Sequence, residues 1–256
     1  MSKLSGAYYE IHHMEQLANE DQWVNHIHPL VKLVLTVLYI ATVVSVNKYD
    51  LPGILILGVY PIAVFILGEI SFTDSVKRVR LILPLVCIVG IFNPFFDRQL
   101  LFTIGNVPIT TGVISMLTLI LKGIYTVFAT YLLIATTTIE KICYAMRLVH
   151  LPSILVTQIL LTYRYISVLL KEANTIMQAY SLRAPNQKGV HFKVWGSLVG
   201  QLLLRSVDRA DNVYSSMMLR GYQGEFRYAR QEKCAGKDYA YLLIWLAIFF
   251  ILRYIL

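Results

Sequence analysis

Long apolar runs that are almost free of charge constrain the fold of this sequence more than any other feature. Hydrophobic residues make up 57% and charged residues 15% of its 256 residues, whereas ordinary soluble domains have about 45–50% and about 25%. A helix needs about 20 largely apolar residues to cross a bilayer. Five runs approach this length: residues 30–46, 51–68, 81–96, 111–138 and 239–256. The sequence therefore predicts an all-α membrane protein with a bundle of about five transmembrane helices.

The segments between the first four runs are short and contain residues that end helices. They lie at residues 47–50, 69–80 and 93–108, and they are rich in charged residues, Asn, Pro and Gly. Such residues indicate turns, so short loops are expected. Inside the runs the charged residues are Lys32, Lys122 and Arg253. No acidic partner accompanies Lys122, which disfavours a stand-alone ion-coupled carrier, because intramembrane relays use paired ionisable residues.

Positive charge gathers between the fourth and fifth runs. Residues 139–238 contain 14 Lys and Arg against 7 Asp and Glu, which accounts for most of the net charge of +8. Cytoplasmic segments carry an excess of Lys and Arg, and the basic loop 69–80 falls on the same side when the spans are counted. The expected organisation in the plasma membrane is a cytoplasmic N-terminal segment (1–29), a four-span region (30–138), a cytoplasmic helical region (139–238) and a last span (239–256).

Residues 151–170 are apolar enough to form a sixth span, with Arg164 as their only charge. An arginine at the centre of a span costs about 3 kcal/mol or more, whereas a helix at the membrane surface keeps the guanidinium in water. The surface position is favoured for this reason, and a sixth span is the alternative.

Two long helices are predicted within the basic region. No Gly or Pro interrupts the chain between Pro152 and Pro185, and a second helical stretch runs from His191 to Gly221. Pro152 is expected at the first helical position, and Gly221 suits a C-terminal cap. A turn is expected between the two helices, at residues 185–189.

Both long helices end on the same pattern, Leu182-Arg183-Ala184 in the first and Leu219-Arg220-Gly221 in the second. A cation at a helix C terminus interacts favourably with the helix dipole, which explains either arginine alone. Two such tips instead favour a paired contact with an acidic partner, because the guanidinium group binds carboxylates and backbone carbonyls.

No motif for catalysis or nucleotide binding is present. The sequence lacks the phosphate-binding loop and the dinucleotide-binding glycine fingerprint, so any ATP chemistry would belong to a partner. Histidines 12, 13, 26 and 28 lie near acidic residues, but a metal site needs ligands in fixed geometry, and interfacial anchoring is favoured. Cys87, Cys143 and Cys234 are too widely spaced for a disulfide framework or a CxxC site. A non-catalytic chain without metal, cofactor or nucleic acid is predicted.

The sequence resembles the transmembrane T component of energy-coupling-factor importers, and within it the cobalt branch, CbiQ. The matching stretches are His28-Pro29-x-x-Lys32-Leu33, Leu151-Pro152, Tyr163-Arg164-Tyr165-Ile166 followed by Glu172-Ala173, the two helix-end motifs, and the run from Leu204 to Glu225. The resemblance covers most of the chain and is densest over residues 152–225. It implies that two long cytoplasmic coupling helices are inserted before the last span.

The resemblance also implies roles for particular residues. Family proteins carry two short Ala-Arg-Gly-like motifs that dock into ATPase subunits, and by position these are Leu182-Arg183-Ala184 and Leu219-Arg220-Gly221 here. Leu replaces the common Ala in both motifs, and Ala184 replaces Gly in the first. The residues expected to support the coupling helices are Arg164, Glu172, Arg205, Asp208 and Arg209.

The implied partners are two ATP-binding-cassette ATPase subunits, or a homodimer of one, and a small membrane S component that captures the substrate. For the cobalt branch that substrate is Co²⁺, with Ni²⁺ or a vitamin as alternatives. A membrane-anchored scaffold, whose basic segment binds anionic lipid or an acidic protein, is the alternative from another functional class. The basic residues are spread over residues 139–238 and alternate with acids, which disfavours a lipid-binding patch.

Overall fold

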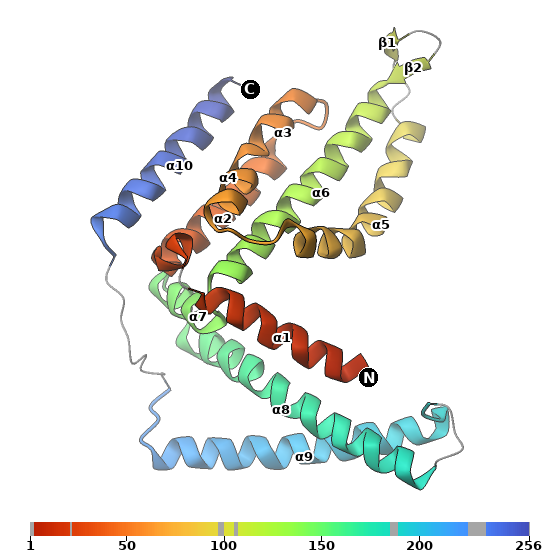
Figure 1. The fold of residues 1–256 in the computed structure, drawn as a ribbon, viewed down its shortest axis with the longest axis vertical. Helices are drawn as coiled ribbons and strands as arrows, with labels where there is room; N and C mark the ends of the chain where they lie inside the picture. Colours follow the sequence, from red (N-terminus) through yellow and green to blue (C-terminus); the bar gives the residue numbers. More distant parts are fainter. Residues whose placement is uncertain are drawn as a thin grey trace. The chain divides into compact units, whose positions relative to one another are not determined.

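The computed structural model describes residues 3–20, 22–96, 100–104, 107–184, 189–224 and 234–255, and most of these residues are helical (Figure 1). The chain divides into two compact units. One, which we call the bundle unit, comprises Leu17–Thr138 and Glu232–Leu256, and the other, the long-helix unit, comprises Met1–Gln16 and Ile139–Gln231. The expected all-α character is confirmed, apart from one short hairpin.

The bundle unit is organised around one central helix, α6 (Thr111–Thr136), against which α2, α3, α4 and α5 pack. Helix α10 packs against α2 and α3. The other elements of this unit are η1 (Trp23–His26), α2 (Pro29–Ser45), α3 (Leu51–Leu57), α4 (Val59–Leu67), α5 (Phe72–Phe96), β1 (Leu100–Ile104), β2 (Val107–Thr110) and α10 (Gly236–Ile255). Each of the five apolar runs therefore folds as helix.

Three local features differ from the expected bundle. The second run is broken at Gly58 into α3 and α4, and a β-carbon at Gly58 would lie 2.6 Å from the hydroxyl of Tyr125 on α6. Helix α5 begins within the expected loop 69–80, and Figure 1 shows that it bends, with Pro84 inside it; proline is a common cause of such bends. Part of the expected loop 93–108 is the antiparallel hairpin β1–β2, in which Leu100 pairs with Thr110.

An aromatic cluster fills the core of the bundle unit between α2, α4 and α10. The ring centroids of Tyr39 and Tyr60 are 4.5 Å apart, those of Tyr60 and Trp245 are 4.8 Å apart, and Phe249 lies 5.6 Å from Tyr39. Such separations are in the range where aromatic pairs attract each other beyond their burial. The Tyr39 hydroxyl donates a hydrogen bond to the Leu57 carbonyl at 3.0 Å, which ties α2 to the end of α3.

Two of the three charged residues of the runs, Lys32 and Lys122, are bound by backbone carbonyls. The ammonium of Lys32 is buried and donates to the carbonyls of Thr136 at 2.8 Å and Asn25 at 3.3 Å. Lys122 donates to the carbonyls of Val46 at 2.6 Å and Val44 at 3.1 Å, at the end of α2. These contacts place both cations on carbonyls that helix ends leave without an intrahelical partner.

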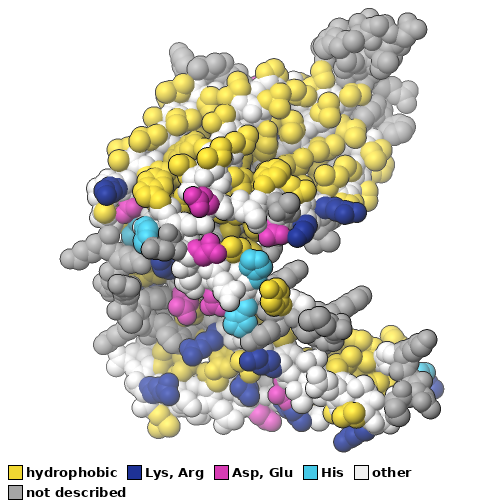
Figure 2. Space-filling model, in the orientation of Figure 1, with side chains coloured by type: hydrophobic (Ala, Val, Ile, Leu, Met, Phe, Trp, Pro, Cys, Tyr) yellow, Lys and Arg dark blue, Asp and Glu magenta, His cyan; other side chains and the backbone are white. Residues whose placement is uncertain are grey.

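Outward-facing side chains of the bundle unit are largely apolar. Figure 2 shows hydrophobic side chains spread across the visible face of its helices. The exposed large hydrophobic residues of α3 and α4 are Leu55, Ile56, Val59, Ile62, Ile66 and Leu67. An exposed apolar surface of this kind fits a lipid environment. By length and composition, α6 and α8 (Ser153–Arg183) are each able to cross a membrane, while α2 and the α3–α4 segment are shorter apolar helices.

The long-helix unit contains most of α1 (Lys3–Asn19), together with α7 (Ile139–Leu148), α8 and α9 (Phe192–Leu219). Helix α7 packs against α8, and α8 packs against α9. With 31 and 28 residues, α8 and α9 are about 46 Å and about 42 Å long. The expectation of two long helices is confirmed, although Pro152 occupies the N-cap of α8 and not its first helical position.

Asp238, at the start of α10, provides a test of the bundle unit. Its buried carboxylate accepts hydrogen bonds from the backbone N–H of His28 at 3.1 Å and of Ala235 at 2.8 Å. Asp238→Ala leaves both donors without this acceptor, and we expect it to lower the free energy of unfolding by about 1–3 kcal/mol. Thermal unfolding of the purified chain in detergent measures the loss. Asp211→Ala, which removes an exposed carboxylate, is the control, and equal losses in both variants would contradict the assignment.

Candidate functional site

The tip of α9 is a glycine-terminated helix end that exposes an arginine. The N–H of Tyr222 donates to the Met217 carbonyl at 3.0 Å, and the N–H of Gly221 donates to the Met218 carbonyl at 3.0 Å. Gly221 has a φ of +77°, so these bonds form a Schellman motif and confirm the expected cap. Arg220 is the C-cap residue and is exposed, and Leu219 beside it is 91% exposed.

The tip of α8 also exposes a leucine and an arginine, but its backbone ends in a different conformation. Arg183 is the last helical residue, and the N–H of Ala184 donates to the Tyr180 carbonyl at 3.1 Å. Ala184 has a φ of −131°, a conformation that does not require glycine. This explains why Ala can stand here where the second motif has Gly221. Leu182 is 82% exposed and Arg183 is exposed.

The two tips lie at opposite ends of the helix pair. The backbone N–H of His191, just before α9, donates to the Tyr180 hydroxyl at 3.4 Å, so α9 begins near the end of α8. Helix α9 then extends away from the end of α8 along its whole length, as the ribbon in Figure 1 shows. Arg183 and Arg220 are therefore held apart by roughly the length of α9, about 42 Å. Residues 185–188 of the turn expected at residues 185–189 lie outside the described residues.

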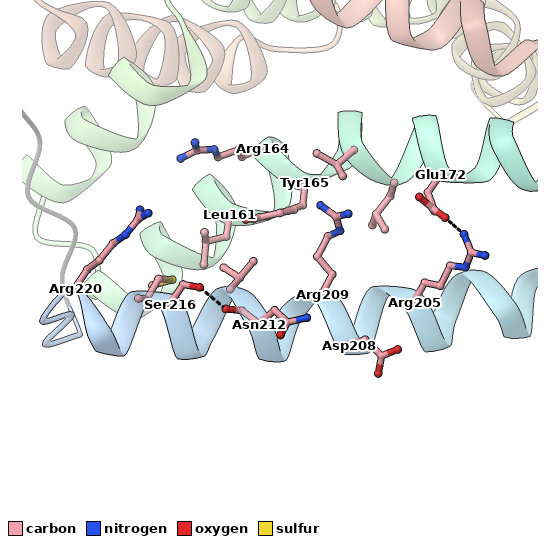
Figure 3. Close-up of a pocket in the computed structure, with 14 residues that line it drawn as sticks. Leu161, Arg164, Tyr165, Glu172, Arg205, Asp208, Arg209, Asn212, Ser216 and Arg220 are labelled. Carbon is pink, nitrogen blue, oxygen red and sulfur yellow. Dashed lines mark hydrogen bonds and ion pairs between the residues drawn. The ribbon is translucent and has the colours of Figure 1, made fainter.

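One ion pair joins the two long helices where they cross. Glu172 on α8 accepts a hydrogen bond from the guanidinium of Arg205 on α9 (Figure 3). Asp208 is exposed, and its carboxylate points away from α8 in the same view. The structure thus brings Glu172 and Arg205 together and leaves Asp208 outside this pair.

A groove of about 660 Å³ lies between α8 and α9 and is strongly basic. Arg164 lines it from α8, and Arg205, Arg209 and Arg220 line it from α9, where Arg209 and Arg220 rise towards α8 (Figure 3). Within the described residues, Arg164, Arg209 and Arg220 make no ion pair with a carboxylate. Three of the four arginines that line this cavity therefore have no ion-pair partner among the described residues, although the acidic residues Glu172 and Asp208 line it as well. We call this cavity the arginine groove.

A second groove of about 700 Å³ lies along the same pair of helices and is mainly apolar. It shares six lining residues with the arginine groove: Leu161, Tyr165, Leu169, Arg209, Val213 and Met217. We call it the apolar groove. The shared residues of α9 lie between those that line only the arginine groove and those that line only the apolar groove, so the two grooves lie on either side of the same line of side chains.

Sequence reasoning identified every arginine of the arginine groove but not the groove itself. Residues 205, 209, 213, 216 and 220 recur at intervals of three or four, which places them on one face of α9. That spacing is a readable signal. It does not show that this face meets Arg164, because the meeting depends on how α8 and α9 cross.

The chemistry available here is binding and not proton transfer. Guanidinium groups stay protonated at all physiological pH values and act as donors only. The one fully buried thiol of α7, Cys143, has its pKa raised by burial and by nearby Glu140, which keeps it unreactive. Within the part of the chain that the structure describes, no three His, Cys, Asp or Glu residues are grouped to hold a metal ion.

Comparison with known proteins places this sequence in a family. Residues 20–231 match the family described as CbiQ, cobalt transport protein. The energy-coupling factor transporter transmembrane protein EcfT of Clostridium kluyveri is 24% identical over 242 residues, which cover 86% of this chain and 87% of that protein. The nickel permease LarQ of Lactiplantibacillus plantarum is 24% identical over 119 residues, or 45% of this chain and 44% of LarQ. An uncharacterized protein of Methanocaldococcus jannaschii is 26% identical over 85% of this chain and 77% of its own length.

The Glu172–Arg205 pair can be tested for its contribution to the helix crossing. Both side chains are partly exposed, so Glu172→Gln should lower the free energy of unfolding by no more than about 1 kcal/mol. The charge-exchanged variant Glu172→Arg/Arg205→Glu should recover most of that loss. Thermal unfolding at low and at high salt measures both effects, and salt should shrink them. Asp208→Asn is the matched control, and a loss of equal size there would show that only net charge matters.

Proposed function

We propose that this chain, which belongs to the CbiQ family of cobalt transport proteins, is the membrane coupling subunit of an ATP-driven importer of the energy-coupling-factor type. Family membership rests on the match over residues 20–231, and the similarity to EcfT of Clostridium kluyveri supports the importer class. In this role the chain hydrolyses nothing itself. It joins ATPase subunits to a membrane protein that captures the substrate.

The observation that carries this proposal is the pair of arginine tips. Arg183 and Arg220 each end a long helix, each lies beside a highly exposed leucine, and the two tips are held about 42 Å apart. Two similar arginine tips that lie far apart suit a partner with two similar binding sites, such as a dimer. We therefore assign each tip to one subunit of an ATPase dimer, with the guanidinium seated among carboxylates or carbonyls.

Helices α8 and α9 would then act as levers. When the ATPase pair closes on ATP, its two docking grooves move, and each tip moves with the subunit that holds it. Glu172 and Arg205 would keep the crossing point of the helices in register, while Arg164, Asp208 and Arg209 would act at the same crossing. The motion reaches the rest of the chain through α7, which packs on α8.

The transported substrate is proposed to be cobalt ion, captured by a separate S component. The family description supports cobalt, and the partial similarity to a nickel permease keeps Ni²⁺ as the second candidate. Metal ligands are assigned to the S component, because the described residues of this chain hold no ligand cluster.

The proposed topology follows the distribution of charge. Residues 1–29 and 139–238 lie in the cytoplasm, residues 30–138 form a four-span region, and residues 239–256 form the last span of a plasma membrane protein. Helix α8 lies at the membrane surface in this arrangement, with a sixth span as the alternative. The excess of Lys and Arg in residues 139–238 supports it.

The docking role predicts loss of partners on removal of both tips. Arg183→Ala/Arg220→Ala should lower recovery of ATPase subunits at least about tenfold when the tagged chain is purified from its native membrane, because truncating one partner of a buried charge pair commonly costs about 2–5 kcal/mol. Mass spectrometry of the purified material measures the recovery. Lys141→Ala/Lys171→Ala removes the same charge from α7 and α8, away from both tips, and should retain the ATPase. Full recovery with the tip variant would exclude docking through these arginines.

The substrate assignment predicts ATP-dependent cobalt accumulation. Cells that express this chain with its ATPase and S partners should accumulate radioactive cobalt, and the tip variant should abolish this uptake while the chain still inserts. Excess unlabelled nickel tests the second candidate by competition. If no metal accumulates and the co-purified S component binds a vitamin, cobalt is the wrong substrate, whereas the coupling role is unaffected.

A further inference from the structure

The charges of the arginine groove are unevenly distributed along its length. Its acidic residues lie with Arg205 at one end: Glu172 accepts a hydrogen bond from that guanidinium, and Asp208 is one helical turn further along α9. Arg164 precedes Glu172 by about 12 Å along α8, and Arg220 follows Asp208 by about 18 Å along α9. Figure 3 shows Arg164 and Arg220 together at the end opposite the Glu172–Arg205 pair. We call this end, defined by Arg164 and Arg220, the basic end; no described acidic residue lines it.

Both arginines of the basic end are accessible to another protein. Arg164 and Arg220 are exposed, and neither makes an ion pair with a carboxylate among the described residues. Asn212 and Ser216, which line the groove beside them, are polar and uncharged and share one face of α9 with Arg220. Two guanidinium groups at one end of a cavity repel each other unless an anion lies between them, and a carboxylate binds both through charge-assisted hydrogen bonds. The basic end is therefore complementary to an acidic side chain.

The two helix tips differ in their relation to this groove. Arg183, at the tip of α8, lines neither the arginine groove nor the apolar groove. Arg220 is the C-cap residue of α9 and also lines the arginine groove, where Arg164 of α8 lies at the same end. The α9 tip is thus continuous with a surface to which both long helices contribute, and the α8 tip lies outside that surface.

We propose that Arg164 and Arg220 together bind one acidic side chain of the ATPase subunit that docks at the tip of α9. This inference rests on the proposed coupling role and deepens it, because it adds a residue of α8 to the docking surface of α9. The partner is identified by continuity: the docking role already assigns an ATPase subunit to the tip that contains Arg220, and the charge of the basic end requires that its contact there be acidic.

The shared contact has a mechanical consequence for the helix pair. An ATPase subunit bound by Arg220 alone would hold only the end of α9. Bound by Arg164 as well, the same subunit is attached to α8 and α9 at once, so its motion is transmitted to both helices. The α8 tip, with Arg183 outside the groove, transmits the motion of the other subunit through α8.

The test is a double-mutant cycle on the affinity of the purified full chain for its ATPase subunits. The probe is the ATPase recovered with the wild-type chain, titrated against each variant in detergent. Arg164→Gln should weaken binding about tenfold, the loss expected for one hydrogen bond to a charged group. In the Arg220→Gln background the same change should cost less than about threefold, because the two arginines share one partner group. In the Arg183→Gln background it should again cost about tenfold, because distant sites act independently.

Matched variants separate this contact from a general effect of charge or packing. Lys171→Gln removes one charge from an exposed residue of α8 that lines neither groove, and it should keep the wild-type affinity. Arg164→Met keeps the aliphatic stem without the charge and should lose as much as Arg164→Gln. Arg164→Lys keeps the charge and should recover most of the affinity. Equal weakening by Lys171→Gln, or equal losses from Arg164→Gln in the Arg220→Gln and Arg183→Gln backgrounds, would overturn the shared contact.

Failure of this inference is distinguishable from failure of the docking role. If Arg220→Gln weakens ATPase binding but Arg164→Gln and Arg164→Met do not, docking through the tips stands and the contribution of Arg164 is refuted. If Arg220→Gln and Arg183→Gln both leave the affinity unchanged, the docking role itself is wrong, and the inference that rests on it is overturned with it.

Discussion

The need to satisfy every polar group in an apolar setting governs the bundle unit. A chain this apolar leaves water no role in pairing its backbone, so the runs fold as helices whose N–H and C=O groups bond internally. Two of the three cations in these runs bind carbonyls at helix ends: Lys32 binds the carbonyl of Thr136, and Lys122 binds that of Val46. Each lysine thereby joins two helices. The aromatic cluster around Tyr60 then packs between elements whose ends these bonds have fixed.

The long-helix unit, in contrast to the bundle unit, buries very few of its residues. Helix α9 has no buried residue along its described length, and α8 has three. A helix that buries so little gains little stability from its own tertiary packing, so α8 and α9 depend on what covers them. This exposure is consistent with the proposed role, in which partner proteins bind these helices. Charged and apolar side chains are both exposed on α8 and α9, and in the proposed role different partners cover them.

The sequence was sufficient for elements that local chemistry decides. The five apolar runs, the two long helices and the glycine cap at Gly221 were all predicted and are confirmed. Other features depend on contacts that no local pattern contains, such as the break at Gly58, where the Tyr125 hydroxyl of α6 lies close to the glycine. The early start of α5 had a readable signal that was missed: Ser71 and Asp74 have the spacing of a capping box, and their side chains are hydrogen bonded at 2.9 Å. The arginine groove could not be predicted, because it depends on how α8 and α9 cross, and residue spacing does not show this.

The tips of α8 and α9 have similar side chains but different backbone conformations. Gly221 follows Arg220 in a left-handed conformation with a φ of +77°, whereas Ala184 follows Arg183 with a φ of −131°. The backbone therefore leaves the two arginines in different directions, and a partner cannot read both tips through the same main-chain contacts. What the tips have in common is the side-chain pair, a guanidinium beside a leucine that is more than four-fifths exposed. Buried arginines surrounded by apolar contacts are typical anchors of protein interfaces. If two equivalent grooves bind the tips, as we propose, recognition must act through these side chains, and the backbone that follows each tip sets the direction in which the chain leaves its partner.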